Sequence, residues 1–450
     1  MDTPLISQYP TEHLTSRGDL RLEAHNTVVG ERARRLFGAN RPESEYLFAT
    51  AALHDFGKAT PQFQAYVRPD ESYEGLDEEK NHARLGALAT WFVLGELNAS
   101  TRDRLAATLA VARHHQALPD AAQYTGETLA RAFDANSETI HAQVAAIAEQ
   151  WPSEAERLLR LTNVDVSWDT FVEWAQSDNP RSELEEVSTR ATLSGTTPDS
   201  ATLPANLYER TLHYWSVLTL ADKSHAMAIP EEHVFDLQTL DLEPIATYVS
   251  DLRDDPPESE LEQELNDERE RARRQAIRGV HEWLSADAAP AYSTITLPTG
   301  LGKTLTGLCA AFEARDILNE QGRGSGPRPI VYALPYTSII EQTRSLFEDP
   351  DLWGADPTKS ALTVHHYLSE TVVYHDEMST RDVDTTDAGE SAHLLGEAWR
   401  DGTILTTFVQ LFESLAGPTN RQGLKLPALE SALVILDEPQ ALPKDWWDGI

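Results

Sequence analysis

The sequence predicts a multidomain protein in which an all-α domain precedes an α/β domain with a parallel sheet. Residues 1–235 place apolar side chains three and four positions apart, which is the spacing of helices that bury one face. From Tyr292 onward, short runs of β-branched residues alternate with helical patterns, and this order is typical of a parallel sheet with helices on its faces. The charged stretch from Asp251 to Gln275 separates the two patterns and predicts a domain boundary.

The helical half contains several long amphipathic windows and two polar interruptions. We expect helices that include Glu23–Phe37, Glu43–Phe56, Ala83–Leu97, Thr101–His114 and Asn206–Met227. The acidic stretch Pro69–Asn81 and the Ser-, Thr- and Pro-rich stretch Ser177–Pro204 predict surface loops.

The second half begins with a highly charged run, Glu258 to Arg274, which predicts a solvated helix. Strands are expected at Ser293–Leu297, Ile330–Leu334, Ala361–Val364, Thr403–Thr407 and Ala432–Leu436. Helices are expected between them, as at Thr304–Asn319 and Ser338–Phe347, and Asp376–Ala392 is expected to be a loop. We therefore divide the chain into a helical domain (1–235), a charged linker with a lead-in helix (236–280) and an α/β domain (281–450).

The composition restricts the class of protein and its compartment. No apolar stretch approaches the ~18 residues of a membrane span, and the N-terminus lacks the basic-then-apolar order of a signal peptide. The lone Cys309 excludes a disulfide scaffold and fits a reducing compartment. We expect a cytoplasmic protein with no membrane partner.

The net charge of -36 arises from 73 Asp and Glu residues against 37 Lys and Arg, of which seven are lysines. An acidic surface normally repels nucleic acid. The excess is spread along the whole chain, however, and this favours adaptation to molar salt, where charges are screened within about 3 Å and carboxylates keep the surface hydrated. Under that interpretation the net charge says little about partners.

A phosphate-binding loop is predicted between the strand at Ser293–Leu297 and the helix that follows. Its glycines allow backbone N–H groups to point at phosphate oxygens, and the helix N-terminus favours an anion. Lys303 would reach the β- and γ-phosphates of ATP, and the Thr304 hydroxyl would bind Mg²⁺. The strict pattern has a further glycine where this chain has Leu297. The expected nucleotide-binding residues of the loop are Thr299, Gly300, Gly302, Lys303 and Thr304.

The apolar run Ala432–Leu436 ends in Asp437 and Glu438, which predicts a Walker B strand on the same sheet. Asp437 would hold Mg²⁺ through water, and Glu438 would orient the attacking water. With these motifs the second half resembles a superfamily 2 helicase with a RecA-like fold. The resemblance places Gln275 as the adenine-reading glutamine, although a surface glutamine on a charged helix is an equal alternative.

Two further segments of the second half resemble the DNA-contacting motifs of such helicases. Leu334–Gln342 resembles motif Ia, and Thr406–Phe412 resembles the DNA-contacting motif that follows it. Both begin at strand ends, where backbone N–H and hydroxyl groups can hold phosphates.

The helical half holds an ordered set of histidines and aspartates on predicted helices or helix ends. A bundle can point such residues at a shared centre. Imidazoles mixed with carboxylates suit Mn²⁺, Fe²⁺, Co²⁺, Ni²⁺ or Zn²⁺ better than Ca²⁺. Two ions bridged by Asp55 could clamp a phosphodiester and acidify water. The candidate metal ligands are His25, His54, Asp55, His82, His114, His115 and Asp222.

This set resembles the HD-type nuclease domain of CRISPR-associated proteins. The resemblance implies one metal at His25, His54, Asp55 and Asp222, and a second at Asp55, His82, His114 and His115. It also implies that Lys58 neutralises a phosphate beside the catalytic Asp55, although Lys58 could equally be an ordinary lysine at a helix C-terminus.

An HD domain ahead of a superfamily 2 helicase resembles the helicase–nuclease of type I CRISPR systems. The resemblance implies a nuclease that degrades single-stranded DNA while translocating 3′ to 5′ on ATP, recruited by an RNA-guided surveillance complex. The sequence ends twelve residues after Glu438, so we expect the second RecA-like domain to be missing from these 450 residues. We expect the 450 residues alone to bind ATP weakly and not to unwind DNA.

Two other functions stay open at this point. One is a superfamily 2 RNA helicase with an HD-type nucleotide phosphohydrolase domain. The other is an ATP-dependent scaffold whose nuclease has decayed. Hydrolysis of single-stranded DNA or of a free nucleotide, and a metal titration, discriminate among the three.

Overall fold

The computed structural model describes residues 14–17, 20–38, 43–67, 80–119, 137–184, 202–240, 242–254, 257, 259–286, 291–322, 328–347, 349, 352, 362–365, 372–373 and 385–442. The chain forms two compact units. The first comprises residues 1–226 and 416–424, and the second comprises residues 227–415 and 425–450.

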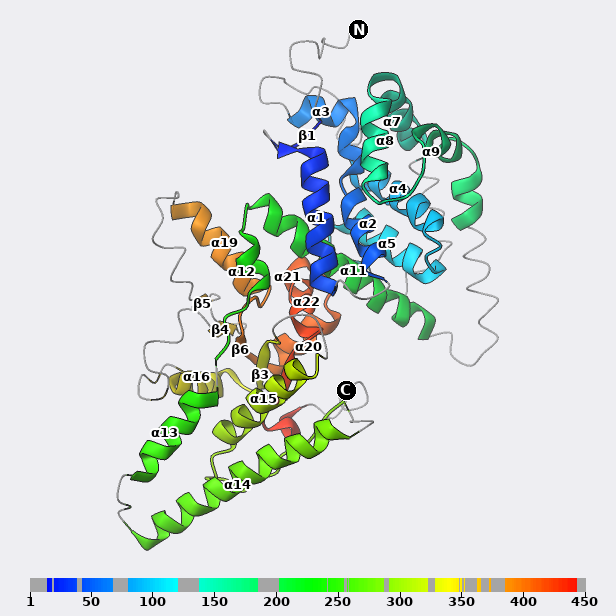
Figure 1. Ribbon diagram of the computed structural model, residues 1–450. Helices are drawn as coiled ribbons and strands as arrows, with labels where there is room; N and C mark the ends of the chain where they lie inside the picture. Colours follow the sequence, from blue (N-terminus) through cyan, green and yellow to red (C-terminus); the bar gives the residue numbers. More distant parts are fainter. Residues whose placement is uncertain are drawn as a thin grey trace. The chain divides into compact units, whose positions relative to one another are not determined.

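The first unit is a helical bundle (Figure 1). Helix α1 (Leu22–Phe37) packs on α2 (Ser44–Leu53) and on α11 (Thr202–Ala226), and α4 (Ala83–Glu96) packs on α5 (Thr101–Arg113), which also contacts α11. Nearly every residue of α2 is buried, as is most of α4. A helix that is apolar all round must lie inside a bundle, which explains why these two have no polar face.

Smaller elements complete this unit. The strands β1 (Thr15–Arg17) and β2 (Leu20–Arg21) pair antiparallel. The remaining elements are a 3-10 turn η2 (Phe56–Ala59) and the helices α3 (Pro61–Val67), α7 (Ser137–Gln150), α8 (Pro152–Arg160), α9 (Trp168–Ala175) and α21 (Asn420–Gly423), the last of which contacts α11.

The second unit is built on a five-stranded sheet in the order β5-β4-β6-β3-β7. The four strands β4, β6, β3 and β7 are parallel, and β5 pairs antiparallel with β4 at one edge. The strand bounds are β3 (Ile330–Leu334), β4 (Leu362–His365), β5 (Val372–Val373), β6 (Thr403–Thr407) and β7 (Leu433–Leu436).

Helices bury both faces of this sheet. Alternate residues of a strand point to opposite faces. Thus Tyr332 packs with Phe312 of α15 (Lys303–Glu320), whereas Val331 packs with Phe408 of α20 (Phe408–Ala416). The other helices of this unit are α12 (Glu231–Phe235), α13 (Leu242–Asp254), α14 (Glu260–Ser285), α16 (Thr337–Phe347), α19 (Thr385–Glu397) and α22 (Leu426–Leu429), and a 3-10 turn η5 covers Pro439–Ala441.

The predicted fold class is confirmed: a helical part precedes an α/β part with a parallel sheet. Seven predicted helices and four predicted strands form within a few residues of their expected bounds. The charged run is helix α14, as expected. None of the helices in the described parts of the chain is long and apolar enough to cross a membrane.

The strand predicted at Ser293–Leu297 is wrong. This segment forms no ladder with any described strand, and most of it is exposed, including Ile295 at 47%. The described sheet ends at β7, where Val434 is 44% exposed. β-Branched composition shows that a segment could line a sheet, but strand formation also requires a partner edge in register.

Two loop predictions and one helix end also need correction. Residues 179–184 are helical and Thr202–Pro204 belongs to α11, while 185–201 lie outside the described residues. Helix α19 occupies residues from Thr385 on, whereas 376–384 lie outside the described residues, as does most of Pro69–Asn81. Helix α2 stops at Leu53, before the predicted Phe56, because the chain turns at His54 and Asp55 into η2.

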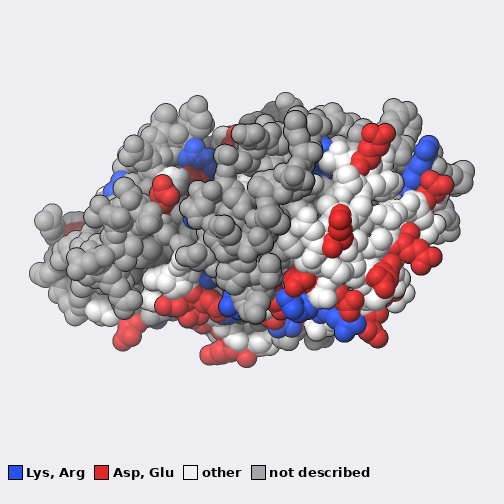
Figure 2. Space-filling model, turned by 90° about the horizontal axis from the view of Figure 1, so that it is seen from above, with Lys and Arg blue, Asp and Glu red and all other residues white. Residues whose placement is uncertain are grey.

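On the face drawn in Figure 2, Asp and Glu side chains are spread across the described surface, with Lys and Arg beside several of them. Helix α14 shows this arrangement in detail, because Arg271 pairs with Glu268 and Arg274 with Glu270. Exposed pairs of this kind contribute little stability and weaken further in salt.

Candidate metal centre and phosphate-binding site

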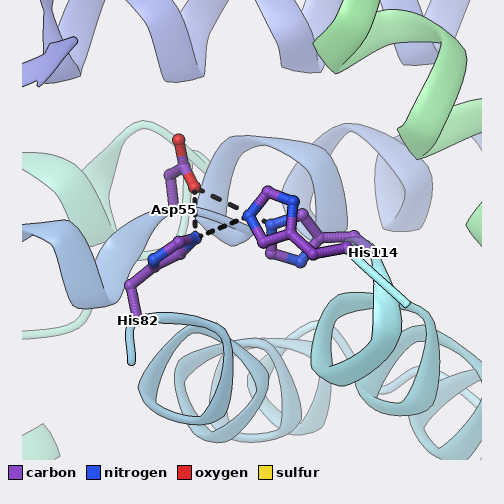
Figure 3. Close-up of side chains that lie close together, drawn as sticks. Asp55, His82 and His114 are labelled. Atoms are coloured by element: carbon purple, nitrogen blue, oxygen red, sulfur yellow. Dashed lines mark hydrogen bonds and ion pairs between the residues drawn. The ribbon is translucent and has the colours of Figure 1, made fainter. Parts of the chain in front are cut away.

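The seven predicted metal ligands come together in the first unit. They form two groups, and within each group all ligand atoms lie within 4.8 Å of one another. The first group is His25, His54 and Asp222, and the second is Asp55, His82, His114 and His115. The close-up in Figure 3 shows Asp55, His82 and His114 pointing toward one another from separate segments.

Asp55 lies between the two groups and presents one oxygen to each. Its Oδ2 is 3.4 Å from Nε2 of both His25 and His54. Its Oδ1 is 3.2 Å from Nε2 of His82 and 3.9 Å from Nε2 of His114. A carboxylate whose two oxygens face two clusters of imidazoles has the arrangement of a bridging ligand.

Asp222 closes the first group from α11. Its Oδ1 lies 3.3 Å from Nε2 of His25 and 3.5 Å from Nε2 of His54. In the second group, Nε2 of His82 is 3.0 Å from Nε2 of His115. Two ring nitrogens this close both face the same small volume.

Two glycines allow the segment around His54 and Asp55 to approach the start of α4. A Cβ on Gly57 would lie 2.6 Å from the His82 Cα. A Cβ on Gly86 would lie 2.9 Å from the carbonyl oxygen of Leu53 and closer still to that of His54. Any larger residue at either position would separate His82 from Asp55, so both glycines serve the centre sterically.

Backbone carbonyls orient two of the imidazoles. Nδ1 of His54 is 2.7 Å from the Ala51 carbonyl oxygen, and Nδ1 of His114 is 2.6 Å from that of Val111. A carbonyl only accepts, so Nδ1 carries the proton in both rings and Nε2 keeps its lone pair for a cation.

The residues present fit divalent cations. Four buried atoms have no hydrogen-bond partner among the described residues, namely Nε2 of His25, His54 and His114 and Oδ1 of Asp55. Buried polar atoms left without partners are costly, and cations ligated by these atoms within the two groups would remove that cost. Imidazole and carboxylate ligands together favour Mn²⁺, Fe²⁺, Co²⁺, Ni²⁺ or Zn²⁺.

The charges of the centre are strongly coupled. Burial opposes ionisation of Asp55, but the neighbouring His54 and Lys58 outweigh it and hold its pKa well below the usual range. Burial also opposes the charged form of His25, yet the carboxylates of Asp222 and Asp55, at 3.3 and 3.4 Å from its Nε2, raise its pKa above 6.5.

The second group behaves differently. Burial, with the neighbouring imidazole of His115, lowers the pKa of His114 well below 6.5. Burial and His82 lower the pKa of His115 to about 4. These two imidazoles are therefore neutral at neutral pH, which is the form that binds metal.

Lys58 lies where the sequence predicted it, beside Asp55. Its Nζ is 2.6 Å from Asp55 Oδ2 and donates to the Ser16 hydroxyl at 3.3 Å. Gln64 anchors the strand that carries Ser16, because its side chain hydrogen-bonds both N–H and C=O of Thr15. Sequence reasoning missed Ser16, since nothing in its local pattern distinguishes it.

Sequence reasoning also missed His225, whose Nδ1 lies 2.8 Å from Nδ1 of His25. It follows Asp222 by three positions on α11, so both face the same side of the helix. That spacing was the signal that could have identified it.

The predicted phosphate loop precedes α15 in the second unit. Gly300 and Gly302 have φ of +87° and +69°, which residues with a Cβ rarely adopt. Lys303 Nζ pairs with Glu438 Oε1 at 2.9 Å, which raises the pKa of Lys303 and lowers that of Glu438. Gln440 donates to the other oxygen of Glu438. The lysine of the predicted phosphate loop and the glutamate of the predicted Walker B strand are thus in direct contact.

Tyr332 joins the two expected Mg²⁺ ligands. Its buried hydroxyl donates to Asp437 Oδ2 at 2.8 Å and also hydrogen-bonds Thr304. Burial, reinforced by Asp437, raises the pKa of Tyr332. Its position in an apolar strand pattern predicted core packing and gave no sign of this contact.

The remaining residues that were predicted to contact a nucleotide or DNA lie as follows. Thr299 is exposed in the loop, and Gln275 is exposed on α14 without a described contact to that loop. Instead Arg269 of α14 donates to the Gly300 carbonyl at 3.0 Å. Thr337 and Phe408 begin helices directly after β3 and β6, at the same sheet edge as Asp437, because the strands are parallel.

The chain is similar to proteins named Cas3. Residues 20–192 match the family described as "Cas3, HD domain". The chain is 65% identical over 462 aligned positions to the "CRISPR-associated nuclease/helicase Cas3" of the halophilic archaeon Haloferax volcanii, covering all of this chain and 49% of that protein. The chain thus spans about half the length of the curated relative it matches.

Two crystal structures of Cas3 from T. fusca are also similar. The ATP complex is 16% identical, with a TM-score of 0.44 over 96% of this chain and 47% of that chain. A second crystal structure is 17% identical, with a TM-score of 0.42 over 95% of this chain and 46% of that chain.

Proposed function

We propose a nuclease function for this chain, whose residues 20–192 match the HD domain family of Cas3 and whose full length matches half of a Cas3 nuclease/helicase. In this proposal the first unit is a metal-dependent nuclease that cuts single-stranded DNA. The observation that carries it is Asp55, which presents one carboxylate oxygen to each of two groups of ligand atoms.

The proposed ligands divide as the two groups do. His25, His54, Asp55 and Asp222 would hold one divalent cation, and Asp55, His82, His114 and His115 would hold the other. Ions such as Mn²⁺, Co²⁺, Ni²⁺ or Fe²⁺ in such a pair polarise a phosphodiester and lower the pKa of water. We propose that the native metal is an ion of this kind, because imidazole and carboxylate ligands together favour such ions.

The protein's own residues supply the rest of the chemistry. The carbonyls of Ala51 and Val111 keep the protons of His54 and His114 on Nδ1, which leaves Nε2 free. Lys58 is 14% exposed beside Asp55 and can neutralise a phosphate that enters the centre. We propose Asp55 and Lys58 as catalytic residues of this nuclease.

For the second unit we propose ATP binding and, in the longer protein, ATP-driven 3′–5′ translocation. Lys303 would exchange Glu438 for a nucleotide phosphate, and this exchange would free Glu438 to orient water. Thr304, at the start of α15, and Asp437, directly after β7, would hold Mg²⁺. Gln275 remains our proposed adenine contact, with Thr299, Gly300 and Gly302 lining the phosphates.

We propose that residues 1–235 form the nuclease domain, that 236–280 form the linker and lead-in helix, and that 281–450 form the first RecA-like domain. The relative's name places it in a CRISPR system. We propose that this chain likewise acts in type I interference, recruited to single-stranded DNA by an RNA-guided surveillance complex.

The test of the nuclease is cleavage of circular single-stranded DNA in molar KCl with Mn²⁺. High salt is used because it screens the mutual repulsion of the carboxylates, which destabilises the folded state of a protein of net charge -36. Circular DNA excludes an exonuclease that requires ends. We expect cutting by the wild type and by Asp165→Ala, which changes an exposed residue of the same unit, and none by Asp55→Ala.

A folded chain that binds Mn²⁺ but leaves circular DNA intact contradicts the nuclease proposal. Hydrolysis of deoxynucleoside triphosphates by that same protein would then indicate a nucleotide phosphohydrolase. A folded chain that binds no Mn²⁺ would indicate a scaffold with a decayed centre.

A further inference from the structure

We propose that His225 is a positioning residue that sets the tautomer and the ring orientation of His25, and thereby the affinity of the first metal group. The inference deepens the proposed nuclease and rests on its metal centre. His225 belongs to neither group of candidate ligands.

The contact between the two rings is close and specific. Nδ1 of His25 lies 2.8 Å from Nδ1 of His225, and the rings stack with centroids 5.0 Å apart at 26°. Helix α1 carries His25 and α11 carries His225, so the contact spans two helices of the bundle. At 2.8 Å two ring nitrogens must share one proton, since two lone pairs or two N–H groups would repel.

The direction of this hydrogen bond follows from the other side of the His25 ring. Nε2 of His25 is buried, lacks a hydrogen-bond partner among the described residues, and lies 3.3 Å from Asp222 and 3.4 Å from Asp55. To ligate a cation there, Nε2 must be unprotonated, so a neutral His25 carries its proton on Nδ1. His25 then donates to Nδ1 of His225, which must accept.

His25 differs in this respect from the other oriented ligands. His54 and His114 donate their Nδ1 protons to carbonyls of their own segments. A helix backbone holds those carbonyls in place whatever the surrounding side chains are. The acceptor for His25 is a side chain two hundred positions away, so the first metal group depends on a residue that never contacts the ion.

A second contact between α1 and α11 lies beside His225. Nη1 of the buried Arg32 donates to the hydroxyl of Ser224 at 2.8 Å. Arg32 lies seven positions after His25, about two turns along the same face of α1. The two contacts therefore fasten α1 to α11 at neighbouring points, one of which is the acceptor of the His25 proton.

The test measures Mn²⁺ binding to the whole chain in molar KCl, by electron paramagnetic resonance of the free ion. His225→Leu keeps the bulk but removes the acceptor. His225→Asn keeps an acceptor oxygen at about the position of Nδ1. His213→Leu is the matched control, because it makes the same change on the same helix outside both groups.

We expect the wild type and His213→Leu to bind two Mn²⁺ ions. We expect His225→Leu to bind one of them about 10–100-fold more weakly, as is typical when the hydrogen-bond partner of a metal-ligating histidine is lost. His225→Asn should return that affinity toward the wild-type value. Melting curves of each metal-free protein separate this effect from loss of folding.

Equal affinities for both ions in His225→Leu and the wild type overturn the inference. Equal weakening in His225→Leu and His225→Asn also overturns it, because a role in packing alone would not distinguish an acceptor from a methyl group. A folded wild type that binds no Mn²⁺ refutes the proposed metal centre itself, and the role of His225 with it.

Discussion

The close approach between α4 and the segment that carries His54 and Asp55 makes Gly86 a sensitive position. Replacing Gly86 by alanine adds a methyl group 2.9 Å from the Leu53 carbonyl oxygen and closer still to that of His54. Both obstacles are backbone atoms, which cannot rotate away. The segment or the helix must therefore shift by several tenths of an ångström.

Two opposing terms set the magnitude. Overpacking in a tight interior costs about 1–3 kcal/mol. Alanine in place of glycine within a helix contributes about 1 kcal/mol of stability. We expect Gly86→Ala to destabilise the first unit by about 0–2 kcal/mol. The shift also displaces His54 and Asp55, so Mn²⁺ affinity and nuclease activity should fall well beyond the loss of folded protein.

Gly279→Ala is the matched control. Gly279 lies in α14, and a Cβ added there meets nothing within 4 Å. This variant receives the gain in helix propensity without the clash, so it should be more stable than the wild type by about 1 kcal/mol.

The assay is scanning calorimetry of the metal-free chain in molar KCl, followed by Mn²⁺ titration of each variant. The expected result is a lower melting temperature and weaker Mn²⁺ binding for Gly86→Ala, with neither loss for Gly279→Ala. A Gly86→Ala protein as stable as Gly279→Ala, with wild-type Mn²⁺ affinity, would refute the reasoning that this glycine is needed for the close approach.

Three further predictions follow from the same contacts. Tyr332→Phe should weaken nucleotide binding about tenfold in Mg²⁺ and leave it unchanged in EDTA, because the lost hydroxyl orders only the Mg²⁺ ligands; equal weakening in both buffers would contradict this. As pH falls, the raised pKa of His25 means that protons displace Mn²⁺ from the first group at a higher pH than from the second, where burial lowers the pKa of His114 well below 6.5 and that of His115 to about 4; simultaneous loss of both ions in a pH titration would count against it. Removing metal with EDTA should destabilise the first unit by about 2.7 kcal/mol per site relative to protein at a hundredfold excess over Kd, and an unchanged melting temperature would speak against metal binding by the folded chain.

Properties that depend on local pattern could be predicted from the sequence. Helical spacing placed α1, α4 and α11 within a few residues, and β-branched runs placed β3 and β6 at their observed bounds. The same reasoning failed at Ser293–Leu297, because a strand is defined by its partner and the sequence does not reveal which edge is available.

The candidate centre shows the same division. The residue types and their order along the chain indicate the chemistry of the candidate ligands. Histidines and aspartates on successive predicted helices therefore sufficed to predict a metal site. The contacts within the centre join residues up to two hundred positions apart. They decide which oxygen of Asp55 faces which group, and they bring His225 against His25. The sequence by itself thus determined the local elements and the donor set. Only the packing of the helices decided which candidate donors lie close together and which neighbours contact them, because hydrogen bonds and metal coordination depend on separations of a few tenths of an ångström that no local pattern encodes.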